Sequence, residues 1–374
     1  MDVQLLRHFE TIVDPRVERT RFHSLIDIIA ITICGVLCGA DGWDDIHFYA
    51  THLESWYRTF LLLEYGIPSS DTIRRVISAM HPDAFHACFQ SWVQSITTHL
   101  PGTVVAIDGK TLRGAYGPDD PKALLHSVNA WSDAQHLVLA EVVVAEKSHE
   151  ITAIPEILKL LMLEGCIVTI DAAGCQKKIT KTIIAQHAGY AITVKGNQEH
   201  VRRDIETTFM AYDARENDST PIIPLVTAEY QHGRHETRTA RLTYDLSRLT
   251  TRADWAGLTH IGMMTRERVL QGEKHTETRY YILSGVTTAE QFAAVVRSHW
   301  GIENCVHWSL DVTFHEDSSR IYDGYGAANI STVRKIALNI LTQDKTKRLS
   351  LRKKRILCSM NPNYLEEVLR NAVF

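Results

Sequence analysis

Two short apolar runs, each closed by an aspartate, set the strongest limit on how this chain folds. Val104–Ile107 precedes Asp108 and Gly109, and Ile167–Ile170 precedes Asp171. Runs of this length that are rich in β-branched residues predict buried strands. Because ligands bind at the carboxyl edge of an open α/β sheet, a strand ending in aspartate predicts a carboxylate at that edge. An aspartate there also caps a turn or helix with no further role, so the pair carries more weight than either residue alone.

The order of the predicted elements around these runs indicates an α/β fold. Residues 125–131 and 136–145 predict two more strands joined by a hairpin, and helix–strand–helix–strand follows over residues 151–195. Three adjoining strands followed by two crossover units give the order of a ribonuclease H-like domain, an order that other α/β folds share. Residues 222–284 alternate polar and apolar residues, which predicts an inserted antiparallel β-sheet.

The regions on either side of the predicted sheet differ in composition. Residues 1–100 have apolar residues at helical spacing and predict an all-helical N-terminal domain. The α/β domain is expected at 101–345, with its β-rich insertion at about 220–285. The last residues are dense in lysine and arginine, which predicts a basic C-terminal tail at 346–374.

Composition narrows the class of protein. The 374 residues are 45% hydrophobic, enough for two or three domains with apolar cores. A net charge of -4 gives no general signal for nucleic acid binding, so such binding depends on local patches. The seven cysteines contain no CxxC pair, and the longest apolar stretch, Ile26–Ala40, includes Asp27 and is too short to span a bilayer. We expect a cytoplasmic protein that does not bind membranes.

A third acidic residue lies on a helix predicted near residues 288–311. His299, Glu303, His307 and Asp311 are four residues apart there and share one helix face. If this face meets the sheet edge, Glu303 completes an all-oxygen ligand set for Mg²⁺ or Mn²⁺ with the two strand-terminal aspartates. Two such ions about 3.5–4 Å apart clamp the attacking and leaving oxygens of a phosphodiester. The alternatives are a solvated helix face, or a single zinc ion bound by the two histidines and the glutamate.

Short motifs from end to end of the chain are shared with one known family. They are Asp14–Arg16, Ala106–Gly114, Thr169–Gln176, Val194–Gln198, His232–Arg234, Ser298–Asn304, His307–Val312, Phe314–Asp317 and Arg334–Asn339. Together they resemble the DDE transposases of bacterial insertion sequences, and specifically the H-repeat-associated, ISAs-type family. The resemblance implies a ribonuclease H-like catalytic domain with a β insertion before the last acidic residue, preceded by a helical domain. By position it gives Asp108, Asp171 and Glu303 as the catalytic triad that binds two Mg²⁺ or Mn²⁺ ions.

The sequence departs from the broader family signature around the glutamate. Relatives place Tyr, Arg and Lys at minus seven, minus four and plus seven from it, where this chain has Val296, His299 and Leu310. Which residue binds the phosphate beside Glu303 is therefore not determined by the sequence. Also open is whether an acidic residue further along takes the place of Glu303 at the metal; the candidates are Asp311, Glu316 and Asp317.

The resemblance implies an insertion-sequence transposase that cleaves and transfers DNA strands, acting as a homodimer on double-stranded DNA. The candidate DNA-binding residues are basic or imidazole side chains near the strand ends, on the glutamate helix and in the C-terminal segment: Lys110, Arg113, Lys195, Arg297, His299, His307, Lys353, Lys354 and Arg355. The arginines of the β insertion offer a second basic surface. The alternatives are a metal-dependent nuclease without strand transfer, and an inactive or domesticated copy that binds DNA without cutting it.

Overall fold

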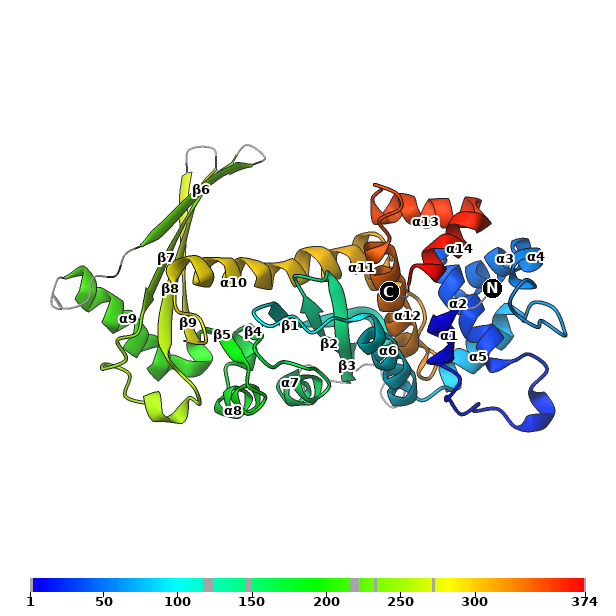
Figure 1. Cartoon of the computed structure of the whole chain (residues 1–374), viewed down its shortest axis with the longest axis horizontal. Helices are drawn as coiled ribbons and strands as arrows, with labels where there is room; N and C mark the ends of the chain where they lie inside the picture. The colour runs from blue at the N-terminus through cyan, green and yellow to red at the C-terminus, as the bar shows by residue number, and fades with distance from the viewer. Residues whose placement is uncertain are drawn as a thin grey trace.

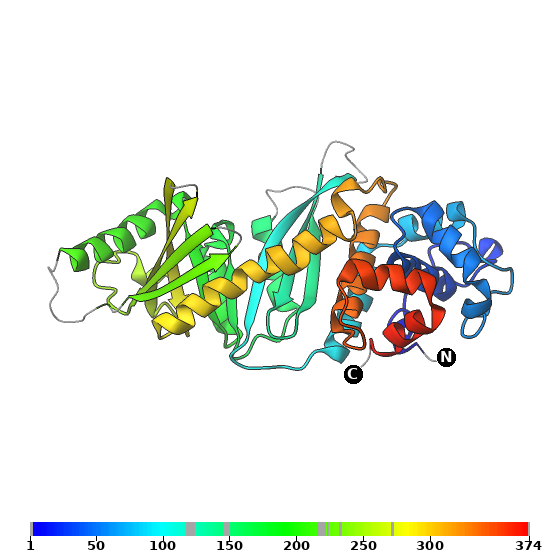
Figure 2. The ribbon, with the colours of Figure 1, turned by 90° about the horizontal axis from the view of Figure 1, so that it is seen from above.

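The computed structural model describes residues 3–116, 124–144, 150–214, 222, 224–231, 234–270 and 273–372. The molecule is elongated: strands fill the middle and one end, and helices from both ends of the chain gather at the other end (Figure 1). A long helix runs over the strands and connects these two regions (Figure 2). The mixed α/β architecture expected from the sequence is confirmed.

The strands form a single nine-stranded sheet with the order β3-β2-β1-β4-β5-β9-β8-β7-β6. Their bounds are β1 (Val104–Tyr116), β2 (Leu124–Ser132), β3 (Leu137–Val144), β4 (Ile167–Ile170), β5 (Gly189–Val194), β6 (Leu225–Gln231), β7 (Arg234–Thr243), β8 (His260–Leu270) and β9 (Glu273–Ser284). β1, β2 and β3 pair antiparallel, and β4 and β5 follow parallel to β1. The strands predicted from the sequence are therefore present, in the predicted order along the chain.

Two features of the sheet differ from the sequence-based expectation. β1 does not end at Asp108; it continues to Tyr116, because the residues beyond Ile107 pair with β2 after the pairing with β4 has ended. The strands of the β insertion do not form a separate sheet. β9 pairs antiparallel with β5 from Tyr190↔Ser284 to Val194↔Tyr280, so the insertion extends the central sheet.

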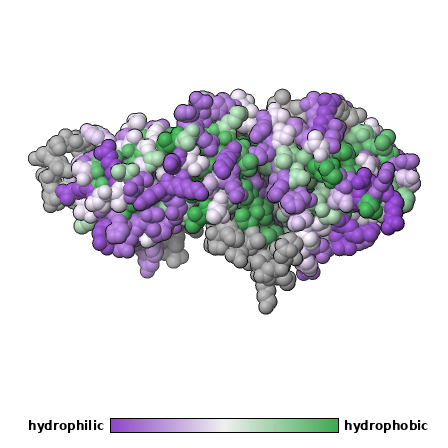
Figure 3. Space-filling view, turned by 90° about the horizontal axis from the view of Figure 1, so that it is seen from below, coloured by the Kyte–Doolittle hydropathy of each residue, from purple (hydrophilic) through white to green (hydrophobic). Residues whose placement is uncertain are grey.

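Helices cover both faces of the sheet. α7 (Glu150–Lys159), α8 (Lys177–Ala185) and α9 (Glu199–Asp213) pack against one face in one apolar cluster. α10 (Ala289–Gly301) packs against the other face through Phe292, Val295 and Val296. On the side seen from below, which carries α7 and α8, hydrophilic residues dominate both ends and apolar residues gather near the middle (Figure 3).

The helix that carries Glu303 is interrupted. α10 leads directly into a π-helix, Ile302–His307, which is followed by α11 (Trp308–Val312) and a 3₁₀ turn at Glu316–Ser318. The sequence predicted one continuous helix here. A short π segment inserted in an α-helix is frequent at functional sites.

The helices from the two ends of the chain share one apolar core. They are α1 (Gln4–Arg7), α2 (Leu25–Cys38), α3 (Trp43–His52), α4 (Glu54–Tyr57), α5 (Ser70–Ala79), α6 (Pro82–Ile96), α12 (Gly326–Gln343), α13 (Leu351–Met360) and α14 (Pro362–Arg370). α2 and α12 are almost entirely buried in this core. Most of the segment expected as a basic tail, 346–374, is helical: α13 and α14 bury Cys358, Leu365 and Val368 in this core, while its basic residues Lys347, Arg348, Arg352 and Lys353 are exposed.

Among the described helices none is by itself long and apolar enough to cross a membrane; α2 and α3 meet that test only as a pair, which is bent by 95°.

Candidate active site

Asp108 and Asp171 lie side by side because β1 and β4 are parallel neighbours. The pairing register ends at Ile107↔Ile170, so each aspartate is the next residue along its strand. Adjacent strands are about 4.8 Å apart, which sets the scale of the separation between the two backbones. The sequence predicted this juxtaposition from the two apolar runs.

Glu303 joins these aspartates from a distant part of the chain. All three carboxylates line one cavity of about 130 Å³, whose wall also includes Lys195 and Arg279. Asp108 is largely buried, with 17% of its side chain exposed, whereas Glu303 on the π-helix is exposed. The cavity is therefore open to solvent on the side of the glutamate.

Each aspartate also bonds to the backbone close to it. Asp171 accepts a hydrogen bond from the Ala173 N–H at 3.0 Å and caps the 3₁₀ turn Ala172–Gly174. Asp108 Oδ1 accepts from the Gly109 N–H at 3.0 Å. The capping role weighed in the sequence analysis is thus real for Asp171, and it fixes the direction in which this carboxylate points.

Two partly buried histidines flank the carboxylates. His299 lines the cavity, and its Nδ1 lies 3.0 Å from Thr169 Oγ1. His307 Nδ1 lies 3.6 Å from Asp108 Oδ2. Burial lowers the pKa of each imidazole to about 4, so both rings are neutral at neutral pH. They act there as hydrogen-bonding groups and do not supply positive charge to a phosphate.

The donor set of the cavity suits a hard divalent cation. Three carboxylates supply oxygen, the ligand atom that Mg²⁺ prefers, and Mg²⁺ is usually held by one or two carboxylates together with waters and substrate phosphates. Within the described residues, no three side chains of His, Cys, Asp or Glu are already arranged to hold an ion. That finding applies to the three carboxylates as well as to the alternative set of His299, Glu303 and His307.

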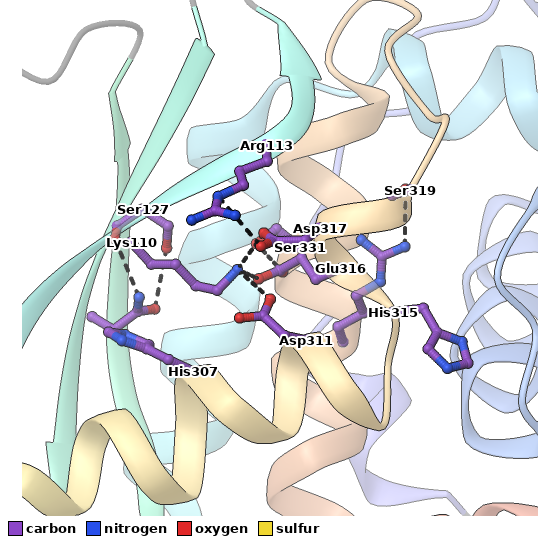
Figure 4. Close-up of polar contacts among 12 residues, drawn as sticks. Lys110, Arg113, Ser127, His307, Asp311, His315, Glu316, Asp317, Ser319 and Ser331 are labelled. Carbon is purple, nitrogen blue, oxygen red and sulfur yellow. Dashed lines mark hydrogen bonds and ion pairs between the residues drawn. The ribbon is translucent and has the colours of Figure 1, made fainter.

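Lys110 does not point toward the cavity or the solvent. It lies two residues after Asp108 on β1, is only 8% exposed, and its Nζ is surrounded by Asp311 (2.7 Å), Asp317 (3.0 Å) and Glu316 (3.1 Å) (Figure 4). The expectation that Lys110 binds DNA is therefore wrong, because its charge is already neutralised inside the protein.

The ionisation of this cluster is fixed by its mutual contacts. Burial acts to lower the pKa of Lys110, but the facing carboxylates outweigh it and raise that pKa above its ordinary value. Burial acts in the opposite sense on Glu316, where Lys335, Lys110 and Arg334 prevail and lower the pKa to about 2. Asp311, Glu316 and Asp317 are occupied by this lysine and do not line the cavity, which leaves Glu303 as the third acidic residue there.

The remaining predicted DNA-binding residues fall into two groups. Lys195 lines the cavity, and Arg113, Arg297 and Lys353 are exposed; of these, Arg113 lies 3.6 Å from Asp317 and Arg297 pairs with Glu229. Lys354 and Arg355 are buried. Lys354 pairs with Asp344 at 3.1 Å and Arg355 donates to the Val36 carbonyl at 3.1 Å, so neither is available to DNA and the prediction for these two is wrong.

Sequence reasoning counted Arg279 only among the arginines of the β insertion, and it missed other residues of the site region. Arg279 of β9 stacks over the Trp300 ring at 4.6 Å beside the cavity. Thr193 lines the cavity from β5. A buried ion pair, Glu141–Lys335 at 2.8 Å, adjoins the Lys110 cluster, since Lys335 Nζ also lies 3.9 Å from Glu316. The sequence feature that could have identified such residues is a single polar or charged residue inside an otherwise apolar strand or helix. Such a residue is uncommon unless it has a polar partner.

Comparison with known proteins agrees with this arrangement. Residues 99–340 match the family described as "Transposase DDE domain", and residues 6–93 match the one described as "DDE_Tnp_1-associated". The chain is 39% identical over 375 residues to "H repeat-associated putative transposase YhhI" of Escherichia coli K12, covering 98% of this chain and 97% of that protein.

Two further relatives differ in how they are described. "Putative transposase YncI" of Escherichia coli O157:H7 is 37% identical, covering 99% of this chain and 95% of its own length. "Inactive transposase YbfQ" of Escherichia coli K12 is 42% identical over 76 residues, which is 20% of this chain and 89% of that protein. The chain belongs to the DDE transposase family, in its H repeat-associated group.

Proposed function

We propose that this protein is the DNA transposase of an insertion sequence and catalyses metal-dependent strand cleavage and strand transfer at the ends of its element. One observation carries the proposal. Asp108, Asp171 and Glu303, which are far apart in the sequence, line a single cavity at the carboxyl edge of the parallel strands. All three positions are acidic, as phosphodiester chemistry with divalent ions requires.

We assign different roles to the side chains around the cavity. Asp108 and Asp171 would hold Mg²⁺ or Mn²⁺, and Glu303 would hold a second ion from the opposite wall. The ions supply activation of the attacking hydroxyl and stabilisation of the leaving oxygen. Lys195 lines the same cavity and provides positive charge for the phosphate being cleaved, whereas the charge of Arg279, which also lines it, is paired with Glu277 at 2.7 Å. The neutral His299 ring is positioned by Thr169 and provides a hydrogen-bonding nitrogen in the cavity wall.

The finer architectural assignments belong to this proposal. The strand order β3-β2-β1-β4-β5, antiparallel and then parallel, supports a ribonuclease H-like core over residues 101–345. The helices before residue 100 form the transposase-associated N-terminal domain. The enzyme acts as a homodimer on double-stranded DNA, since two element ends must be brought together, and it meets that DNA in the bacterial cytoplasm.

A cleavage and joining assay tests the proposal. The substrate is DNA that carries the ends of the element, with Mn²⁺ supplied. Asp108→Asn, Asp171→Asn and Glu303→Gln are each expected to abolish nicking while the folded protein still binds DNA. Glu273→Gln, a change at an exposed acid far from the cavity, serves as the matched control and is expected to keep full activity. Full activity of Glu303→Gln together with loss in Asp311→Asn would reassign the third acidic residue.

The same assay separates two alternative functions. Cleavage without any joined product, even when a free 3′-hydroxyl end is supplied, would indicate a nuclease. DNA binding without cleavage by the unmodified chain would indicate an inactive copy, a state that the name of one relative records. The intact set of three carboxylates favours the active enzyme over this last alternative.

A further inference from the structure

A groove of about 780 Å³ is lined by residues of β2, β3, the π-helix, α12 and the segment that follows α12. Its apolar lining includes Trp131, Leu338 and Leu351. Its polar rim includes Lys345, Lys347 and Arg348, from the segment that links α12 to α13. All three basic residues are exposed. A long groove with a basic rim is suited to an extended polyanion.

Consecutive residues of the π-helix line the groove and the catalytic cavity. Asn304 and Cys305 line the groove, and they follow Glu303 directly on the π-helix. Glu303 lines the cavity itself. The two sites therefore lie at the same segment of this helix.

The basic charge at the groove is not neutralised by the protein. Across the described residues, the side chains of Lys347, Arg348, Arg352 and Lys353 have no hydrogen bond or ion pair, and all are exposed. The acidic residue in this stretch, Asp344, is buried and occupied by Lys354 at 3.1 Å and the Tyr364 hydroxyl at 2.7 Å. The segment consequently presents a net positive charge to solvent.

The arginines of the β insertion, in contrast, form ion pairs with carboxylates of the protein. Arg266 and Arg268 both pair with Glu236, at 2.7 and 2.9 Å. Arg241 pairs with Asp213 at 2.7 Å, and Arg279 pairs with Glu277 at 2.7 Å. This second basic surface suggested by the sequence is therefore largely compensated, and a phosphate there must compete with carboxylates already in place.

We propose that the groove rimmed by Lys345, Lys347 and Arg348 binds the sugar–phosphate backbone of the DNA that continues from the cleaved phosphate. This inference rests on the proposed function, because it takes DNA as the substrate. Phosphate contacts from uncompensated lysine and arginine release counterions, so they supply affinity that depends on salt and not on base sequence. The groove then sets the direction in which the DNA leaves the active site.

The test is a DNA-binding titration of the double variant Lys347→Ala/Arg348→Ala in the full-length protein. A fluorescently labelled DNA duplex is the probe, and its dissociation constant is measured over a series of salt concentrations. Each lost phosphate contact is expected to lower the slope of log affinity against log salt by about 1. The charge-reversed variant Lys347→Glu/Arg348→Glu is expected to weaken binding further at low salt.

The matched control is Lys178→Ala/Lys181→Ala on α8. These two lysines are also exposed, and the change removes the same charge from the opposite face of the sheet. Its salt slope is expected to equal that of the unmodified protein, and circular dichroism verifies that every variant is folded. Equal slopes in the two alanine double variants overturn the inference. If the unmodified protein shows no salt-dependent DNA binding at all, the proposed function fails instead.

Discussion

The Lys110 ammonium lies 2.7 Å from Asp311 Oδ1, and this ion pair connects the strand that carries Asp108 to the helix that carries Glu303. Lys110 and Asp108 are two residues apart on β1, so their side chains leave the same face of the sheet. Asp311 follows Glu303 along the interrupted helix. The pair therefore fixes the relative position of two proposed metal ligands without contacting the metal or the DNA.

Lys110→Met is expected to lower the free energy of unfolding by about 3 kcal/mol, because it removes one cation from the buried Glu316 and from the partly exposed Asp311 and Asp317. Urea denaturation measures the loss. Lys110→Arg retains the charge and serves as the control, with a smaller loss. A methionine variant as stable as the unmodified protein would show that the three acidic partners do not depend on this lysine.

Gly301→Ala is expected to destabilise the junction between α10 and the π-helix. A Cβ at this position lies 2.4 Å from the Trp131 ring, which is itself buried in the core. Overpacking of this kind costs about 1–3 kcal/mol, which thermal melting detects. Gly196→Ala is the control, since a Cβ there meets no atom within 4 Å. Equal melting temperatures for the two variants would contradict the predicted clash.

Glu316→Gln is expected to change how stability depends on pH. The neighbouring cations lower the pKa of Glu316 from 4.5 to about 2 in the folded protein. The carboxylate therefore contributes stability above its unfolded pKa, and this contribution, on the order of 3 kcal/mol, is lost as pH falls from 4.5 toward 2. Urea denaturation at several pH values should show that the free energies of unfolding of the unmodified protein and of Glu316→Gln become more similar as the pH is lowered. A difference that stays constant would rule out this linkage.

Arg355→Ala is expected to lower stability by about 3 kcal/mol, because the guanidinium donates to the carbonyl groups of Val36 and Thr313 in the helical core. The adjacent Lys353→Ala, at an exposed position, should change stability by less than about 0.5 kcal/mol. Urea denaturation compares the two variants. If Arg355→Ala unfolds at the same urea concentration as Lys353→Ala, the buried arginine is not a structural residue.

The sequence predicted the parts of the fold that local patterns determine. Strand periodicity located the strands of the sheet, and the apolar runs before Asp108 and Asp171 identified two neighbouring parallel strands. The pattern did not reveal that β9 pairs with β5, since the two strands are separated by the whole insertion and each is consistent with several partners. It also placed the end of β1 too early, because charged and glycine residues continue a strand when a neighbour supplies its hydrogen bonds.

The electrostatic organisation of the site was least accessible from the sequence. Lys110 and Arg355 appear as basic residues in a composition count, yet both are buried against acceptors that lie far away in the chain. Spacing along a strand shows which face a side chain leaves, but not what lies opposite. Glu303 was located from the helix face that it shares with His299, His307 and Asp311, and the family motif around it then gave it as the third acidic residue.

The π-helix at Ile302–His307 makes this part of the chain sensitive to the insertion or deletion of a residue. In a regular α-helix, eight residues turn through about two turns and 80° more. The π segment lies between Glu303 and Asp311 and takes up roughly one extra residue, so it sets the direction from which Asp311 meets Lys110 of β1 at 2.7 Å. Deleting a single residue between them would rotate everything downstream by roughly 100°, and the acid–lysine register with β1 would be lost although no functional side chain had been removed.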